Sequence, residues 1–304
     1  MTPHMMSSTT TALPDGYYIA QLRAEHLPWV QAIVAHTMSF DSPVWSRVHY
    51  PDGGPTQRAY DMYHAMETSS LQSIKSGLSY GVFWAEHRPK SSPATPDQAE
   101  SANTETDNSS TGALHWDFTN PHATRGQLLE QMDFPLVSIA MSKDAAESSS
   151  TTVNPLSSTT TTTTHKPWAA IVDGHRDISD TLKALDPRRP SLYSPASKGL
   201  VARRSGTHTR GDHANRGLAK ALAHFIMHKV LRELGYQAIL IHAGGEGLNR
   251  VWLNPPAGEG FRAEEVSKFD TKGYVREADG KRVFGDAEVV SKRIWVTLEG
   301  NDKV

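Results

Sequence analysis

The sequence predicts a mixed α/β fold, in which helices flank a sheet. Short segments rich in β-branched and aromatic residues, such as residues 80–85, alternate with longer segments of helical periodicity. Residues 217–234 form the clearest helix, because apolar residues recur on one face and Gly235 provides a typical stop. From residue 200 onward the order is strand, glycine turn, helix, strand, short helix and strand, which favours a mixed sheet.

The other elements follow from the same two patterns. Strands are expected at residues 17–22, 80–85, 114–118, 136–141, 168–172, 200–209, 238–242 and 294–298. Helices are expected at residues 25–38, 56–75, 178–185 and 217–234, and a short helix after residue 242 must end before Pro255 and Pro256. The segment 114–118 is expected to pair with the strand at residues 80–85.

Two segments, residues 89–111 and 147–164, are rich in Ser and Thr and contain little that could be buried. Such a composition does not offset the entropy cost of ordering the chain, so both are predicted to be mobile loops. The strand and helix pattern continues on both sides of them. We therefore expect a single domain, residues 1–304, with two insertions.

Composition excludes several classes of protein. The 31 basic and 33 acidic residues leave a formal charge of −2, which gives no electrostatic reason to expect nucleic acid or an anionic membrane as a partner. Cysteine is absent, so disulfides and thiolate chemistry are excluded. No segment has the ~18 consecutive apolar residues that a membrane span needs, and the N-terminus lacks the pattern of a secretory signal. The expected location is the cytoplasm or the nucleus.

The turn between residues 209 and 218 has the composition of an anion-binding site. Gly211 and Gly217 allow backbone amides to approach a ligand closely, and Gly217 opens a helix whose N-terminus carries partial positive charge. Arg210 and Arg216 add formal charge. A pyrophosphate would suit this turn, although an ordinary strand-to-helix turn accounts for the same glycines equally well.

Residues 213–222, His-Ala-Asn-Arg-Gly-Leu-Ala-Lys-Ala-Leu, resemble the acetyl-CoA signature of the GNAT N-acetyltransferase superfamily. In that signature a Gln or Arg is followed by two residues, a Gly, one residue and a Gly or Ala at the start of a long helix. Gly217 and Ala219 match the last two positions, whereas Ala214 stands at the first. The resemblance covers about a third of the chain, and Gly260 with Phe261 resembles a Gly-Phe pair that often ends the family's last helix.

The resemblance implies a mostly antiparallel central sheet with two splayed central strands, and an acyl-CoA-binding core at about residues 198–262. It implies acetyl-CoA as acyl donor and no metal, with a small amine or a protein amino group as acceptor that attacks the thioester directly. The backbone of residues 204–209 would face the pantetheine arm. The residues expected to bind the donor are Thr209, Arg210, Gly211, Asn215, Arg216, Gly217, Leu218 and Ala219.

The catalytic groups are less well defined by the resemblance. The family commonly uses a tyrosine after its fifth strand, and no tyrosine lies between residues 248 and 261. Candidates are His242 and Glu246, at the exit of the predicted strand 238–242, and His208, at the end of the preceding one. A coenzyme A-binding protein without turnover, or another α/β nucleotide-binding enzyme, remains an alternative. The only histidine pair at helical i, i+4 spacing, at residues 224 and 228, lacks the glutamate of zinc peptidases.

Overall fold

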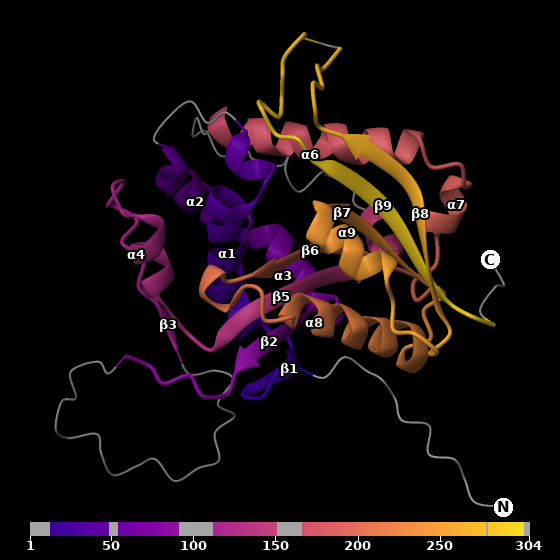
Figure 1. The fold of residues 1–304 in the computed structure, drawn as a ribbon, viewed down its shortest axis with the longest axis horizontal. Helices are drawn as coiled ribbons and strands as arrows, with labels where there is room; N and C mark the ends of the chain where they lie inside the picture. Colours follow the sequence, from indigo (N-terminus) through magenta and orange to yellow (C-terminus); the bar gives the residue numbers. More distant parts are fainter. Residues whose placement is uncertain (1–12, 49–53, 91–111, 151–165, 278, 301–304) are drawn as a thin grey trace, which may run out of the picture.

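The structure is a computed structural model that describes residues 13–48, 54–90, 112–150, 166–277 and 279–300, with the backbone alone for residues 148–150 and 166–173. Seven strands form one sheet in the order β1-β2-β5-β6-β7-β9-β8 (Figure 1). The β6–β7 pair is parallel and every other neighbouring pair is antiparallel. The strands are β1 (Tyr17–Gln21), β2 (Tyr80–Trp84), β5 (Leu136–Asp144), β6 (Val201–Thr209), β7 (Ala238–Gly244), β8 (Phe261–Asp270) and β9 (Val290–Leu298), and a separate small ribbon joins β3 (Ala113–Leu114) to β4 (Met132–Asp133).

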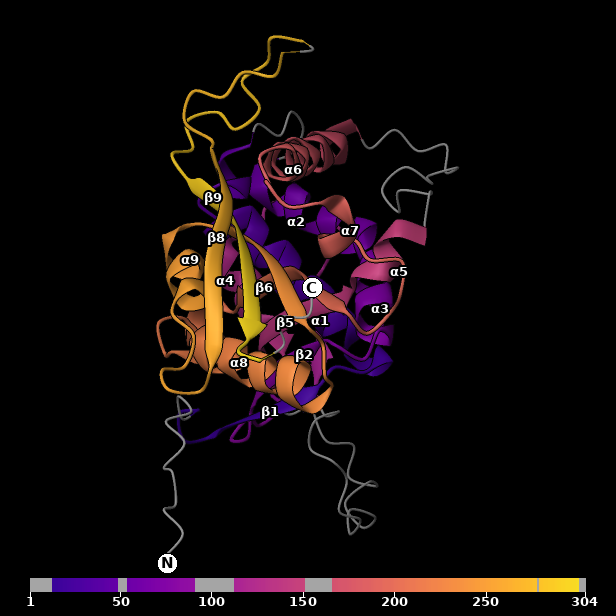
Figure 2. The ribbon, with the colours of Figure 1, turned by 90° about the vertical axis from the view of Figure 1, so that its right-hand side faces the viewer.

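Helices cover both faces of this sheet (Figure 2). One face, called here the α1/α6 face, carries α1 (Leu27–His36), α2 (Gly54–Ala65), α3 (Glu67–Lys75) and α6 (Lys166–Ala184). The other, the α8/α9 face, carries α8 (Leu218–Ile226) and α9 (Glu246–Leu253). The remaining helices are α4 (Arg125–Glu130), α5 (Ala145–Ser150) and α7 (Pro190–Tyr193). Of the described helices, none has the length and apolarity needed to cross a membrane.

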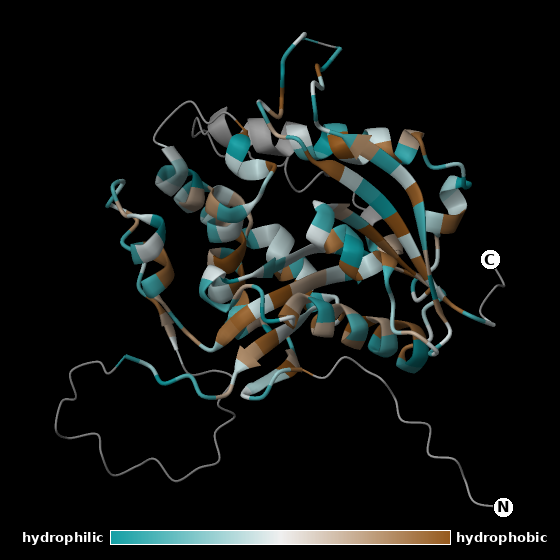
Figure 3. Cartoon of the chain, viewed as in Figure 1, coloured by the Kyte–Doolittle hydropathy of each residue, from teal (hydrophilic) through white to brown (hydrophobic). Residues whose placement is uncertain are grey.

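The sheet separates two main apolar cores, because successive residues of a strand point to opposite faces. Leu136, Ile139 and Met141 of β5 pack on the α1/α6 face, whereas Val137 and Ala140 pack under α8. Figure 3 shows β5 as hydrophobic along most of its length, while β8 at the sheet edge alternates with hydrophilic residues. The strands in the middle of the sheet are therefore built to be covered on both sides.

Strands β6 and β7 are paired over only part of their length. Their pairing ends at Arg204 and Ile241, and Ser205 is an extra residue on β6 where the register with β5 shifts. Beyond that point the facing edges of the two strands are no longer paired. Ser205 is exposed and residues 206–209 are only half-buried, although β6 is the fourth of seven strands. We call this opening, residues 205–209 of β6 and 242–244 of β7, the splay. It corresponds to the two splayed central strands that the family resemblance implied.

Most predicted strands are confirmed. The strands expected at residues 17–22, 80–85, 136–141, 200–209, 238–242 and 294–298 are β1, β2, β5, β6, β7 and β9. Two helices are confirmed in outline: α1 continues into a π-helical turn, Thr37–Asp41, and α8 into another, Met227–Glu233. Gly235 ends the latter with a φ of 72°. Most of each predicted insertion, residues 91–111 and 151–165, lies outside the described residues, and residues 147–150 belong to α5.

Four expectations about the elements are wrong. Residues 168–172 are helical and begin α6, which also absorbs the short helix expected at 178–185. A short apolar run has no periodicity that separates a strand from a helix, which explains the error. Residues 113–114 pair with β4 instead of β2. The helix expected at 56–75 is two helices, α2 and α3, and strand β8 follows Gly260 where a helix end was expected.

Candidate functional site

The turn between β6 and α8 ends in an open helix N-terminus. Asn215 and Gly217 both have positive φ angles, 61° and 77°, a conformation that asparagine and glycine tolerate best. The first intrahelical hydrogen bond runs from Ala221 N to Gly217 O at 3.0 Å. The amides of residues 218–220 precede it and have no partner within the helix. A Cβ added to Gly217 would have nothing within 4 Å, so the space beside the first residue of this N-terminus is open.

The two arginines of this turn differ in what they do. Arg210 is buried, and its guanidinium donates to the carbonyls of Met132 and Phe134 at 3.0 Å and to the carboxylate of Asp212 at 2.8 Å. It therefore braces the turn against the β4–β5 segment. Arg216 is exposed and donates to the Tyr17 hydroxyl at 2.9 Å.

The remaining predicted donor-binding residues lie along the same turn. Thr209 ends β6 with its hydroxyl 2.8 Å from that of Ser138. Gly211 lies where a Cβ would come within 2.6 Å of Arg125 Nη2. Leu218 is buried under the sheet, so it can offer a ligand only its backbone amide. All eight residues thus lie in the segment from the end of β6 to the first turn of α8. Their contact with a ligand stays a prediction.

His208 lies inside the splay on the α1/α6 face. Its Nδ1 is 2.8 Å from the Thr37 hydroxyl, which in turn lies 2.8 Å from the Ile33 carbonyl of α1. Because a hydroxyl has a single proton and the carbonyl can only accept, this arrangement favours Nδ1–H donating to Thr37. The lone pair of His208 is then on Nε2, beside Gly206, where an added Cβ would lie 2.9 Å from it. Burial and the charge of nearby Arg204 lower the pKa of His208 to about 4, so the ring is neutral at physiological pH.

Two polar hydrogen-bond donors without partners lie on the opposite, α8/α9 face near the closed end of the splay. Arg204 is buried, its guanidinium lies 5.3 Å from the centre of the Trp252 ring, and burial lowers its pKa to about 9. It donates to Ser142 Oγ and to the Gly206 carbonyl, but its Nε and the Nε1 of Trp252 are buried without a hydrogen-bond partner. A buried polar atom without a partner is costly, and a functional role is one of the explanations for such an atom.

His242 points to the α1/α6 face, where its Nε2 accepts a hydrogen bond from Arg293 at 2.9 Å. Arg293 is itself held by Asp186 at 2.7 Å, deep under α6. Burial and the neighbouring arginine charges hold the pKa of His242 well below its usual range. Since the Nε2 lone pair is already engaged, His242 is less available than His208 to accept a proton.

Glu246 begins α9 and is exposed, 2.6 Å from Arg250 one turn later. Its side chain points to solvent and is paired, so the structure does not bring it together with His208. Its predicted catalytic role stays untested.

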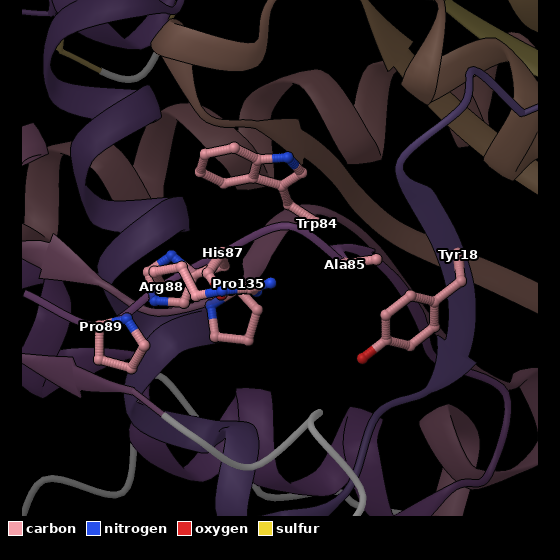
Figure 4. A pocket seen from close by; sticks show the side chains of 7 residues that line it. All are labelled: Tyr18, Trp84, Ala85, His87, Arg88, Pro89 and Pro135. Carbon is pink, nitrogen blue, oxygen red and sulfur yellow. Dashed lines mark hydrogen bonds between the residues drawn. The ribbon is translucent and has the colours of Figure 1, made fainter.

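The hollow drawn in Figure 4 is separate from the splay. It has a volume of about 250 Å³ and lies at the sheet edge, between Tyr18 of β1, Trp84 of β2 and Pro135. The other tryptophan considered for an acceptor pocket, Trp116, is buried and donates to the Leu128 carbonyl at 2.8 Å. Among the described side chains, no group of three or more His, Asp or Glu could hold a metal ion.

Several residues of this region escaped sequence reasoning. Thr37, Arg204 and Trp252 reach the splay from the end of α1, from β6 and from α9. Trp45 stacks on His175 of α6 with ring centres 3.8 Å apart, on the α1/α6 face. The alternation of β6 could have placed Arg204 and His208 near one opening, but nothing local indicates their partners.

Sequence comparison finds neither a matching protein-family model nor a significant match among curated proteins. Solved structures do match. The C-terminal condensation domain of Ebony, in complex with β-alanyl-dopamine, is 15% identical with a TM-score of 0.52, covering 92% of this chain and 97% of that one. Agmatine N-acetyltransferase is 11% identical with a TM-score of 0.52, covering 92% and 99%. A mosquito arylalkylamine N-acetyltransferase, like 5b, is 13% identical with a TM-score of 0.51, covering 93% and 99%.

At these identities the likeness shows the fold. The chain has the GNAT fold of N-acetyltransferases, with a seven-stranded, mostly antiparallel sheet flanked by helices, as its resemblance to that superfamily predicted.

Proposed function

We propose that this protein transfers an acyl group, most simply acetyl, from coenzyme A to the amino group of a small molecule. One observation carries the proposal: in a GNAT fold, the unpaired edges of β6 and β7 open beside the free amides at the N-terminus of α8. An extended arm fits between unpaired strand edges, and a pyrophosphate fits a helix N-terminus. The structural neighbours are named for small amines such as agmatine and arylalkylamines, which supports an amine acceptor.

The residues of the turn would bind the donor as follows. The amides of residues 218–220 have no partner within the helix and can donate to phosphate oxygens, and the space around the Cα of Gly217 is open. Arg216 lies at the surface of the same turn and can add charge. The unpartnered Nε of Arg204 and Nε1 of Trp252 are suited to donate hydrogen bonds near the thioester end of the arm. Together these groups could bind acyl-CoA without a contribution from Arg210, because the guanidinium of Arg210 already donates to the Met132 and Phe134 carbonyls.

The chemistry needs a base for the amine and a route for the leaving thiolate. The amine nitrogen attacks the thioester carbonyl, the C–N bond forms as the C–S bond breaks, and the amine proton passes to His208 Nε2. Thr37 orients the ring so that the Nε2 lone pair is available. Because the lowered pKa makes this nitrogen a weak base, the proton passes to it only as the C–N bond forms and the amine becomes acidic. The guanidinium of Arg204, on the other face of the sheet, is near enough for its charge to act on His208, and it can stabilise the departing thiolate electrostatically.

The first experiment is calorimetric titration of the protein with acetyl-CoA, ATP and NAD in parallel, followed by an assay of thiol release over a panel of amines. We expect acetyl-CoA alone to bind and at least one amine to release coenzyme A. Binding of ATP or NAD without acetyl-CoA would overturn the proposal. Binding of acetyl-CoA with no thiol release would favour a coenzyme A-binding protein instead.

Variants of the proposed base sharpen this test. His208→Gln should lower kcat about 10²-fold or more, the usual contribution of general-base catalysis, with little change in acetyl-CoA affinity. Gly206→Ala should lower kcat in the same direction because its methyl group would displace the His208 ring. His122→Gln is the matched control, since His122 is exposed and distant in the sequence from these residues. Equal kcat values for the His208 and His122 variants would show that His208 is not the base.

A further inference from the structure

Beside the splay, the α1/α6 face of the sheet contains a cation that has no counter-ion among the described side chains. Arg203 lies on β6 one residue before the last paired position, opposite Lys143 of β5 and facing α6. Its side chain is only partly exposed, and burial lowers its pKa. Among the described residues, no carboxylate lies within salt-bridge distance of it and no acceptor lies within hydrogen-bond distance, and Asp180 acts on it only through a longer-range charge interaction.

The neighbouring cations are different, because each has a partner. Arg293 of β9 is paired with Asp186 at 2.7 Å, and Lys183 of α6 with Asp180 at 3.1 Å. The described carboxylates of this region, Asp180 and Asp186, are therefore already paired. Leaving an arginine charge partly buried without a partner costs free energy, so Arg203 is a position that an anion from solution would stabilise.

Lys143, on the adjacent strand β5, is a second partly buried cation without a described counter-ion. It is paired directly across from Arg203 in the β5–β6 register, it is partly buried, and burial lowers its pKa. Glu147, the nearest acidic influence on it, is paired with Lys198 at 2.6 Å. Two cations that have no counter-ion within the described part of the chain thus lie side by side, on the face of the sheet that also contains His208 and His242.

We propose that Arg203 and Lys143 bind an oxyanion carried by the acceptor, so that the acyl acceptor is an amine with a carboxylate or phosphate at some distance from its amino group. The inference rests on the proposed function and specifies the substrate class of the same site. The guanidinium of arginine pairs with the two oxygens of such a group in a bidentate manner.

The spacing of the two ends favours a long acceptor. His208 Nε2 lies beside Gly206, three residues beyond Arg203, and three residues of strand span about 10 Å. An α-amino acid has its amine next to its carboxylate and cannot reach both ends at once. An ω-amino acid, whose amine is separated from the carboxylate by several methylene groups, can place the amine at His208 and the carboxylate at Arg203.

The test uses three amines of equal length that differ only at the far end: 6-aminohexanoate, hexylamine and 1,6-diaminohexane, with 6-aminohexyl phosphate as a fourth arm. Their binding to the protein saturated with coenzyme A is measured by calorimetry, which needs no turnover. We expect at least one of the two anionic amines to bind about ten-fold or more tightly than hexylamine, and the diamine to bind most weakly. Comparing the carboxylate with the phosphate then identifies the preferred oxyanion.

Arg203→Gln should abolish this preference and leave the affinity for hexylamine and for coenzyme A unchanged, and Lys143→Gln should reduce the preference. Arg282→Gln, a change at an exposed arginine in the β8–β9 connection, is the matched control and should keep it. The inference would be overturned if the protein bound the anionic amines, hexylamine and the diamine with equal affinity, or if it bound the diamine most tightly. It would also be overturned if none of these amines bound. If coenzyme A itself fails to bind, the proposed function has failed instead.

Discussion

The N-terminus of α8 allows a substitution test in which charge is the only difference between two variants. Gly217 has a φ of 77°, and a Cβ added there would meet nothing within 4 Å. Gly217→Asp and Gly217→Asn therefore share the same shape, the same open surroundings and the same conformational cost, about 1 kcal/mol for a non-glycine residue in this region. Only the aspartate brings a negative charge to the place proposed for the pyrophosphate.

The size of the effect follows from electrostatics. Two unit charges about 4 Å apart repel by about 1 kcal/mol in water and about 4 kcal/mol at the effective dielectric constant of a protein surface. Gly217→Asp should therefore bind acetyl-CoA between about 5-fold and about 10³-fold more weakly than Gly217→Asn. In the free protein the order of stability should be the reverse. A carboxylate at a helix N-terminus is stabilising by about 0.3–1 kcal/mol, so the aspartate variant should melt at the same or a higher temperature.

Calorimetric titration with acetyl-CoA, together with thermal unfolding without ligand, measures both quantities. The difference in affinity between the two variants should shrink as salt is added, because screening weakens repulsion at an exposed site. Equal affinities of the two variants at low salt would refute the reasoning and show that the turn is an ordinary strand-to-helix connection. A loss of affinity in both variants, to the same extent, would point to the backbone conformation and not to a bound anion.

Two further predictions concern protonation and stability. Because burial lowers the pKa of His208 to about 4, its Nε2 stays unprotonated as the pH falls, so kcat with a weakly basic aromatic amine should be flat between pH 5 and 7.5; an inflection near pH 6.5 would indicate an unperturbed histidine. Asp186→Ala removes the carboxylate that holds buried Arg293 and should lower the free energy of unfolding in urea by about 3–5 kcal/mol. The exposed pair of Asp180 with Lys183 should contribute less than about 1 kcal/mol, so Asp180→Ala serves as the control, and equal losses would contradict the assigned role of burial.

Much of the fold could be predicted because its signals are local. The strands β2, β5 and β7 each contain a run of mainly apolar or aromatic residues, and the helix after Gly217 has an apolar stripe. Residues 168–172 show the limit of this reasoning. The run is too short to display a period, so a strand and a buried helix turn look alike until the neighbouring elements choose between them. Strand β8, which the sequence did not predict, gave a weak signal for a different reason: most of its residues are exposed, so its sequence has few apolar positions.

By itself, the sequence determined the turn between β6 and α8, because the positive φ of Gly217 and the unpaired amides that follow are properties of a few adjacent residues. Only the tertiary structure separated the candidates around that turn. In the folded protein His242 accepts a hydrogen bond from Arg293, whereas His208 is oriented by Thr37. Arg210 donates to backbone carbonyls, and Arg203 has no counter-ion among the described residues. The physical reason is that the partner that sets the availability of a polar side chain is commonly distant in the sequence, as Thr37 is 171 residues from His208.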